Sequence, residues 1–331
     1  MSIKTTYTME LKVYYSTLAT CDYSQEAIST LLKDAPTDLV CGIVIFCQED
    51  KTGYHNMLDR FKTSLDKHIG RKIPVTLVPQ PLLPTDGLSA EIYTLSTIED
   101  IRFHEGYGLI QNENSSLIFI EGIASSDFKD GVFKQSTEVF EKLDTILATH
   151  GFSPDDIVRQ WNYIGNITRH RDDRQNYQEF NDARSAYYKK GSWANGYPAA
   201  TGIGASCEGI IVGCIAYKSA GSIYPINNPL QIAAHEYSRK VLVDDNANAI
   251  KSTPKFERAK LIEIGDQACC FVSGTAAIRG EQSMDANSAS YQTIQTIANI
   301  EYLVSKENLE RYGCKPYEDR KSTRLNSSHC L

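Results

Sequence analysis

Two short stretches decide how this sequence is read. They are Phe119-Ile120-Glu121-Gly122-Ile123-Ala124-Ser125 and, later in the chain, Phe271-Val272-Ser273-Gly274-Thr275-Ala276-Ala277. Each copy ends an apolar run typical of a β-strand, at 116–124 and 268–276, and each leads through a loop into a helical pattern. A strand–glycine–helix pattern that recurs within one chain predicts two related α+β units.

The two helical patterns have different continuations. The first spans 133–149, ends at His150-Gly151 as a C-cap glycine, and has apolar residues at helical spacing. Further elements of this unit are predicted in order, as a strand at 157–164, a helix at 175–190 and more strand at 197–217. The second helical pattern, at 291–304, has no such continuation before residue 318, so the second unit is expected to be incomplete.

The first hundred residues are less regular. The sequence predicts a buried strand at 39–47, a helix at 54–69 and an extended, proline-rich stretch at 73–84. This region is either a degenerate third unit or a cover over the other two. The expected divisions are an N-terminal α/β region at 1–103, a first unit at 104–220, a truncated second unit at 221–318 and a tail at 319–331.

The tail differs in kind from the rest of the chain. Residues 319–329 have no apolar period, and they resemble the in-frame translation of a common sequencing adapter over eleven positions. We therefore expect 319–331 to be non-native, with a genuine polar tail as the alternative.

Composition sets the class of protein and excludes some partners. The 331 residues are 41% hydrophobic and 23% charged, which is ordinary for a globular protein. The net charge of −7 repels phosphate backbones, so nucleic-acid binding is not expected. No apolar run reaches the ~18 residues of a membrane span, and the N-terminus does not resemble a secretory signal. The expected location is cytoplasmic, with no membrane partner.

The nine cysteines and seven histidines show no metal-binding spacing. Several cysteines lie within apolar strand-like runs, where a reduced thiol behaves as a small hydrophobic side chain. We predict structural cysteines, no metal site and no cofactor.

Two arginines are candidates for anion binding. Period-two alternation places Arg159, Trp161 and Tyr163 on one strand face, so Arg159 either snorkels at a sheet edge or lines a pocket for a planar anion. Helical spacing places Arg184 on one stripe with Asn181 and Tyr188. Taken alone, that spacing favours a solvated arginine on an amphipathic helix.

The stretch 197–205 is rich in small residues. Its sequence is Tyr197-Pro198-Ala199-Ala200-Thr201-Gly202-Ile203-Gly204-Ala205. Small residues allow a ligand to approach the backbone, whose amides can bind carboxylate oxygens. Because strand rather than helix comes next, Gly202-x-Gly204 is not a dinucleotide-binding fingerprint.

The order of these elements resembles the reactive-intermediate deaminase (Rid) superfamily. That resemblance implies tandem Rid-like, chorismate-mutase-like α+β units, each a mixed β-sheet with helices packed on one face. In Rid deaminases an arginine typically follows Pro-Ala and holds the substrate carboxylate. Here Ala200 stands at that position, which argues against imine or enamine hydrolysis.

The sequence is more similar to the chorismatase branch, which carries two Rid-like units in one chain. The resemblance covers roughly residues 104–305. It rests on several motifs in order, which are Arg159-Gln160-Trp161-Asn162-Tyr163, 177–184, 197–205, Asn228-Pro229-Leu230-Gln231, 254–259, Ser273-Gly274-Thr275-Ala276 and 292–299. One departure is 278–281, where many relatives carry a Gly-His pair, and it leaves the product type open.

The resemblance implies removal of pyruvate from chorismate without a cofactor. The product would be a dihydroxycyclohexadiene carboxylate or 3-hydroxybenzoate. A general acid would protonate the enol ether, and arginines would hold the carboxylates of the dianion. The expected acid is a glutamate in a closing strand that this chain lacks, so the catalytic residue is unassigned and the chain is expected to be inactive as it stands. The predicted substrate-binding residues are Arg159, Arg184, Tyr197, Thr201, Gly202, Gly204, Gly274, Thr275 and Gln292.

Other functions are a Rid-type deaminase and a non-catalytic module that binds a small anion or a partner protein. Rid proteins trimerise to form sites between subunits, whereas covalently joined units can form such a cleft within one chain. We therefore expect a monomer.

Overall fold

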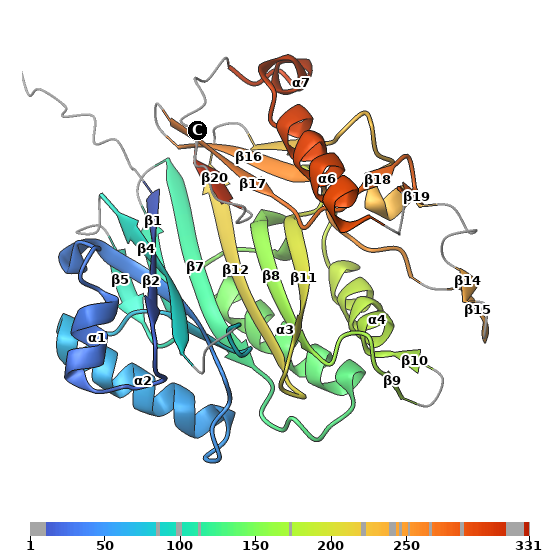
Figure 1. Ribbon diagram of the computed structural model, residues 1–331. Coiled ribbons are helices and arrows are strands. Elements are labelled where there is room, and N and C mark those ends of the chain that lie inside the picture. Colours follow the sequence, from blue (N-terminus) through green and yellow to red (C-terminus); the bar gives the residue numbers. More distant parts are fainter. Residues whose placement is uncertain are drawn as a thin grey trace, which may run out of the picture.

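The computed structural model describes residues 11–83, 87–96, 101–111, 114–171, 174–219, 223–237, 243–244, 247–250, 252–264, 267–284, 288–315 and 328–330. Three β-sheets follow one another along the chain, and α-helices lie on their outer side (Figure 1). We name them the N-terminal, central and C-terminal sheets. Most of the predicted tail, 319–327 and 331, lies outside the described residues.

The N-terminal sheet has four strands in the order β1-β4-β2-β3. β2 and β3 are parallel, and β4 is antiparallel to both β1 and β2. Nearly all of β2 is buried, which its continuous apolar sequence predicts for a strand covered on both faces. The elements are β1 (Leu11–Leu18), α1 (Gln25–Leu31), a 3₁₀ turn (Thr37–Leu39), β2 (Val40–Cys47), α2 (Tyr54–Ile69), β3 (Val75–Pro79) and β4 (Leu88–Leu95).

The central sheet has six strands in the order β11-β8-β12-β7-β6-β5. β11 is parallel to β8, and the remaining neighbours are antiparallel. The elements are β5 (Ile101–His104), β6 (Tyr107–Gln111), β7 (Ser115–Ala124), α3 (Val132–Thr149), a 3₁₀ turn (Pro154–Asp156), β8 (Ile157–Gly165), β9 (His170–Arg171), β10 (Arg174–Gln175), α4 (Asn176–Tyr188), β11 (Ala199–Ala205) and β12 (Ile210–Ser219).

These two sheets share one topology. In each, a strand–helix–strand–helix–strand–strand sequence folds so that the last strand lies between the first two, and the second and third strands are parallel. β1, β2, β3 and β4 thus correspond to β7, β8, β11 and β12. The irregular sequence of the first hundred residues hides this likeness.

The C-terminal sheet has the order β13-β16-β17-β20 and is antiparallel throughout. Its first three strands correspond in order to β5, β6 and β7, and α6 comes next as α3 does. The elements are β13 (Ile223–Ile226), a 3₁₀ turn (Ala234–Glu236), β14 (Val243–Asp244), β15 (Ala247–Ile250), β16 (Ala259–Ile264), β17 (Gln267–Val272), β18 (Ile278–Arg279), β19 (Gln282–Ser283), α6 (Ala289–Leu303), α7 (Lys306–Arg311) and β20 (Ser328–Cys330).

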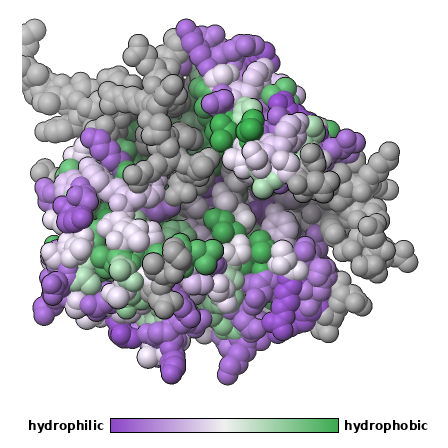
Figure 2. Space-filling model, in the orientation of Figure 1, coloured by the Kyte–Doolittle hydropathy of each residue, from purple (hydrophilic) through white to green (hydrophobic). Residues whose placement is uncertain are grey.

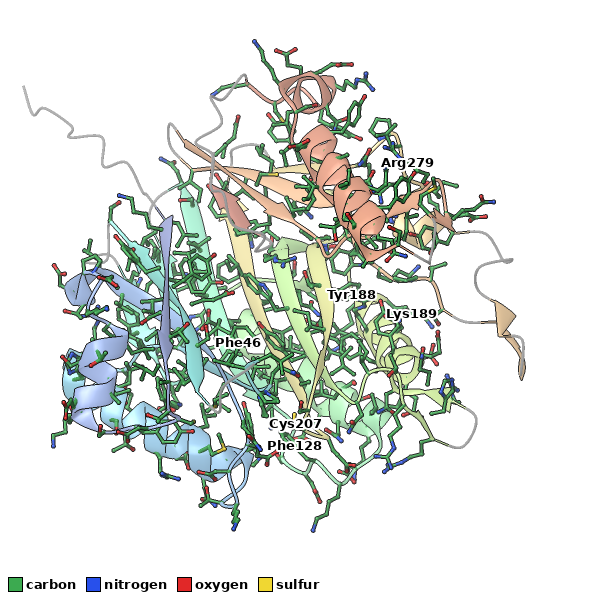
Figure 3. The ribbon with its side chains drawn as sticks, viewed as in Figure 1. Phe46, Phe128, Tyr188, Lys189, Cys207 and Arg279 are labelled. Carbon is green, nitrogen blue, oxygen red and sulfur yellow. The ribbon has the colours of Figure 1, made fainter. Side chains whose placement is uncertain are left out.

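The sheets turn their inner faces toward a shared core. One continuous apolar cluster includes Ile45 of β2, Phe119 of β7 and Phe271 of β17, which come from three different sheets. Phe46 lies between the N-terminal and central sheets, with its ring 6.2 Å from that of Tyr163 (Figure 3). Because burial of apolar area is the main favourable term in folding, this core holds the three sheets together.

The outer faces pack on helices. α3 and α4 cover the central sheet, and α6 and α7 contribute Leu303 and Leu309 to a smaller core behind the C-terminal sheet. On the face drawn in Figure 2, apolar residues gather toward the middle and hydrophilic residues surround them. Among the described helices, none combines the length and the apolar character that crossing a bilayer requires.

The α+β class with mixed sheets is confirmed, as are most predicted elements. The helix predicted at 54–69 has those bounds, and that predicted at 133–149 begins one residue earlier. The strand predicted at 268–276 ends at Val272, because Ser273 and Gly274 leave β17 to bond with the central sheet.

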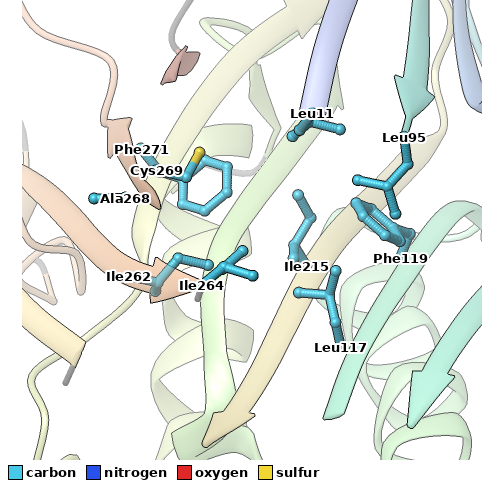
Figure 4. A pocket seen from close by; sticks show the side chains of 10 residues that line it. All are labelled: Leu11, Leu95, Leu117, Phe119, Ile215, Ile262, Ile264, Ala268, Cys269 and Phe271. Atoms are coloured by element: carbon cyan, nitrogen blue, oxygen red, sulfur yellow. The ribbon is translucent and has the colours of Figure 1, made fainter. Parts of the chain in front are cut away.

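A small apolar cavity of about 30 Å³ remains where the three sheets meet (Figure 4). Its lining is Leu11, Leu95, Leu117, Phe119, Ile215, Ile262, Ile264, Ala268, Cys269 and Phe271. A buried water needs two or more polar partners, which this lining does not supply. The cavity is therefore imperfect packing between sheets and not a polar ligand site.

Candidate functional site

Each repeated glycine motif joins two neighbouring sheets. In the first copy, the backbone N–H of Gly122 donates to Thr76 Oγ1 of β3 at 3.0 Å. In the second copy, the N–H of Gly274 donates to Thr201 Oγ1 of β11 at 3.1 Å. We call these contacts the first and second junctions. Because β3 and β11 are corresponding strands, the two junctions are equivalent places in the fold.

Their polar residues differ. Thr76 pairs across the sheet with Val44, and Thr201 pairs with Trp161, so the residues two positions earlier on β2 and β8 correspond. Those residues are Gly42 and Arg159. The carboxylate of Glu121 occupies the space beside Gly42, where an added Cβ would lie 3.3 Å from Oε1.

The residue that corresponds to Glu121 in the second motif is Ser273. Its hydroxyl accepts from the N–H of Ala200 at 2.9 Å and donates to the carbonyl oxygen of Glu257. The first junction therefore carries a carboxylate, whereas the second carries a guanidinium and a hydroxyl.

Arg159 is fully buried at the second junction. Its Nη2 donates to Thr201 Oγ1 at 2.7 Å, and its guanidinium lies 4.6 Å from the centre of the Trp161 ring. Burial lowers the pKa of Arg159 to about 10, and nearby Tyr93, Tyr163 and Glu91 partly oppose this. The group stays charged at neutral pH. Burial excludes the solvent-snorkelling alternative and leaves a guanidinium in a site of low polarity.

Arg184 lies elsewhere. Gln160 bonds to Tyr188 of α4, so this helix covers the face of β8 opposite to Arg159. Arg184 is only 2% exposed and donates to Asn181 Oδ1 at 2.6 Å. The solvated arginine that helical spacing favoured is therefore wrong, because α4 turns this stripe inward.

A second cation lies near Arg184. Burial lowers the pKa of Lys255, and the positive charge of Arg184 lowers it further. The Lys255 ammonium lies 5.6 Å from the centre of the Tyr197 ring, which stacks on Tyr188 with 5.9 Å between centroids. Arg184, Tyr197 and Lys255 thus form a cationic aromatic group on the helix side of β11.

Two buried side chains of opposite charge hold the chain that leads into β11. Glu257 accepts from the N–H of Tyr197 at 3.0 Å, and Lys260 Nζ donates to the carbonyl oxygens of Gly196 and Tyr197 at 2.8 and 3.1 Å. Burial lowers the pKa of Lys260 to about 8, although Glu257 opposes this. Glu257 and Lys260 therefore fix the segment that positions Thr201.

The backbone beyond Thr201 is open. β11 is an edge strand of the central sheet, and Gly202 is exposed. An added Cβ on Gly202 or Gly204 would meet Tyr177 at 3.2 Å or Ile167 at 2.8 Å. Both glycines therefore relieve packing on the helix side while leaving this edge strand accessible to a ligand.

The remaining predicted residues are less connected. Thr275 directly follows Gly274, and its hydroxyl is buried with no hydrogen-bond partner. Gln292 lies on α6 and is partly buried. The structure thus brings Arg159, Thr201 and Gly274 into one group and Arg184 and Tyr197 into another.

The sequence analysis did not predict four residues of the site, which are Glu91, Lys255, Glu257 and Lys260. The last three lie in or beside the 254–259 motif, but the contacts that they make with Gly196 and Tyr197 span more than 50 residues, so local spacing carried no signal. Within the part of the chain that the structure describes, no group of three or more His, Cys, Asp and Glu side chains is placed to hold a metal ion.

Comparison with known proteins identifies relatives of the first part of the chain. Residues 95–216 match the family model described as chorismatase FkbO/Hyg5-like, N-terminal. The chain is 30% identical over 176 residues to a 3-hydroxybenzoate synthase of Streptomyces hygroscopicus, covering 51% of this chain and 48% of that protein. It is 30% identical over 181 residues to a chorismatase of Streptomyces rapamycinicus, covering 54% and 51%. The chain spans about half the length of these curated relatives.

A solved structure extends the likeness in fold. A crystal structure of a chorismatase at 1.08 Å resolution superposes with a TM-score of 0.64 at 19% identity, covering 93% of this chain and 82% of that one. At this identity the likeness shows the fold. Together with the sequence relatives, it confirms the similarity to chorismatases that the motifs predict.

Proposed function

We propose, from the chorismatase match of residues 95–216, that this protein removes pyruvate from chorismate at the second junction. The single observation that carries the location is the buried guanidinium of Arg159 bonded to Thr201 beside the N–H of Gly274. The first junction has the carboxyl group of Glu121 in the corresponding place, where the second has a guanidinium.

Chorismate is a dianion with an enolpyruvyl ether, so its site must supply donors to two carboxylates. Arg159 can pair both oxygens of one carboxylate, because its planar fork matches their spacing. Low polarity around the guanidinium strengthens this attraction relative to water. Arg184, Tyr197 and Lys255 form a second cationic group on the helix side of the sheet, and we assign it to the other charged end of a ligand that lies across the exposed edge of β11.

The exposed backbone of β11 completes the proposed site. Gly202 and Gly204 leave this edge open for a planar ring to approach, and we also assign Thr275, which follows Gly274, and Gln292 of α6 to the ligand. Glu257 and Lys260 are positioning residues, because they hold the segment that carries Thr201 and do not face the ligand.

The reaction needs a proton on the methylene carbon of the enol ether. Protonation gives an oxocarbenium ion, water adds to it, and pyruvate leaves. Elimination of pyruvate without net addition of water, which aromatises the ring, would instead give 3-hydroxybenzoate. We assign no residue to the acid, since the resemblance implies a glutamate in a strand with no counterpart among the described residues of 223–318.

The departure at Ala200 favours this function over a Rid-type deaminase. Ala200 is 3% exposed, and its N–H bonds to Ser273, so the position is filled by a contact between sheets. We also propose that the N-terminal, central and C-terminal sheets represent three copies of one unit, which would form the site within a monomer.

Pyruvate release from chorismate tests the function. The assay would use this chain and a version in which residues 319–331 are replaced by the continuation encoded by the resequenced gene, without added metal or nucleotide. We expect both proteins to bind chorismate and the second to release pyruvate, with the co-product identifying the subtype. Binding without release by the folded second protein would indicate an anion-binding module and contradict the enzyme assignment.

A further inference from the structure

Two cysteine thiols of the N-terminal sheet share one phenol hydroxyl. Cys21 lies in the irregular segment between β1 and α1, and Cys47 is the last residue of β2. Cys21 Sγ lies 3.2 Å from Tyr23 Oη, which lies 4.0 Å from Cys47 Sγ. Cys21 is half-buried, whereas Cys47 is fully buried. The segment between β1 and α1 thus brings a partly accessible thiol beside a second, enclosed one.

The surroundings favour the charged form of the outer thiol. The hydrogen bond from Cys47 lowers the pKa of Cys21 to about 6, with further help from Tyr23 and Arg60 and opposition from burial and Asp50. The hydrogen bond to Cys21 and burial raise the pKa of Cys47. Arg60 lies over the Tyr23 ring at 5.1 Å and pairs with Asp50 at 2.8 Å, so its charge is partly shared. Asp22 points away and bonds to Ser24.

Other described cysteines lie in the opposite environment. Burial raises the pKa of Cys41 and Cys214, and it raises those of Cys207 and Cys314 to about 11. A thiol must be ionised to attack an electrophile, so these buried thiols are inert at neutral pH. Cys21 combines ionisation, partial exposure and an adjacent second thiol, which is the arrangement of redox-sensing cysteines.

We propose that Cys21 is a peroxide-reactive thiol and that Cys47 resolves its oxidised form into a Cys21–Cys47 disulfide. In the first step, the Cys21 thiolate attacks a peroxide oxygen, and the O–O bond breaks. The sulfur gains a hydroxyl as a sulfenic acid, and the leaving oxygen takes a proton from solvent. In the second step, Cys21 no longer carries the negative charge that helps to raise the pKa of Cys47. The Cys47 sulfur attacks the Cys21 sulfur as its proton passes to the displaced hydroxide, which leaves as water. With hydrogen peroxide, two thiols and one peroxide give one disulfide and two waters.

The expected rate advantage is largest at mildly acidic pH. At pH 6 a thiol with a pKa near 6 is about half ionised, whereas an ordinary thiol is ionised to about 0.3%. A more acidic thiolate is a weaker nucleophile, which reduces the advantage to roughly tenfold.

Peroxide oxidation of the whole chain with peptide mapping tests the proposal. At pH 6 and limiting hydrogen peroxide, we expect a Cys21–Cys47 peptide pair lighter by two hydrogens as the first product. Cys47→Ser should instead leave a sulfenic acid on Cys21 that reacts with a dimedone probe. Tyr23→Phe should slow the reaction, and Cys41→Ser on the same strand as Cys47 should leave it unchanged.

Two results would overturn the proposal. One is oxidation of Cys21 in the unmodified chain no faster than that of Cys314. The other is the same product in the Cys47→Ser variant as in the unmodified chain. If a substitution prevents folding, the comparison of Cys21 with Cys314 in the unmodified chain still tests the proposal. None of these outcomes depends on chorismate turnover.

Discussion

The first and second junctions are the same contact made twice, and they differ in openness and charge. At both, the N–H of a glycine in β7 or just after β17 donates to a threonine hydroxyl on a strand of the preceding sheet. Thr76 is 1% exposed, whereas Thr201 is partly exposed and Gly274 is exposed. The threonine is thus enclosed at the first junction, beside a partly exposed Glu121, whereas at the second junction the threonine and the glycine reach the surface above a fully buried Arg159.

This difference shows how one structural contact can serve two purposes. Gly122 adopts a φ of +71°, and an added Cβ would lie 2.1 Å from the carbonyl oxygen of Val75. At the first junction, therefore, the backbones of two sheets approach each other so closely that no Cβ fits at position 122. Gly274 meets only the side chain of Thr201, so the second junction leaves room for a ligand.

Alanine substitution of the two glycines should have unequal effects on stability. Gly122→Ala combines a strained φ with a backbone clash and should cost about 3 kcal/mol or more. Gly274→Ala, with a Cβ 3.1 Å from Thr201 Cγ2, should cost about 1 kcal/mol or less. Denaturant unfolding measures the free energy of unfolding of both variants. Equal losses would contradict the difference in packing between the two junctions.

Removing the guanidinium should abolish tight binding while leaving the fold intact. Arg159→Ala deletes the buried cation proposed to pair with a carboxylate, which should weaken chorismate affinity by about 100-fold. Calorimetric titration measures the affinity, and thermal unfolding checks the fold. Arg169→Ala is a matched control, because Arg169 is 59% exposed and pairs with Glu208. Unchanged affinity in Arg159→Ala would remove that residue from the site.

The lysine beneath β11 should affect stability in a pH-dependent way. Lys260→Met loses the bonds to Gly196 and Tyr197 and should cost about 1–2 kcal/mol at pH 7. Since the pKa of Lys260 is lowered to about 8, the folded protein binds fewer protons than the unfolded chain between about pH 8 and 10.5. Its contribution to the free energy of unfolding therefore rises with pH in that window. Unfolding of both proteins at pH 7 and 10 should give a larger difference at pH 10, and a smaller one would contradict the assignment.

The contribution of Glu121, at the first junction, to the free energy of unfolding should change with pH in the direction opposite to that of Lys260. Burial, assisted by the charge of Glu91, raises the pKa of Glu121, and one of its oxygens is buried with no hydrogen-bond partner. The stability contributed by its protonated form is present below about pH 4.5 and is lost as pH rises toward the raised pKa. Glu121→Gln should therefore gain on the order of 1 kcal/mol relative to wild type between pH 5 and pH 8. A pH-independent difference in melting temperature would contradict this.

Much of the fold could be predicted from local patterns. Helical periodicity and flanking glycines identified α2 and α3 almost to the residue. The repeated glycine motif predicted related units, and both of its copies lie where two sheets meet. The topology shared by the N-terminal and central sheets was not predictable, because β2 has an apolar sequence where β8 carries Arg159, Gln160 and Asn162. β2 and β8 thus hold corresponding positions in their sheets but share little sequence.

The site was less predictable for a different reason. Alternation on β8 placed Arg159 on the correct face, but helical spacing alone could not show that α4 buries Arg184. Lys260 and Glu257 act on backbone atoms some 60 residues away, and such contacts depend on tertiary packing. The sequence repeat therefore predicted related units, whereas the contacts between them and the burial of their charged side chains depend on tertiary packing.

Hydrogen exchange with and without chorismate tests the central claim most directly. The account predicts added protection of backbone amides at 199–205 and 273–276, with none at 75–79 or 120–123. Because the two junctions are equivalent places in the fold, the first serves as an internal control. Protection at the first junction, or equally at both, would contradict the assignment of the site to the second.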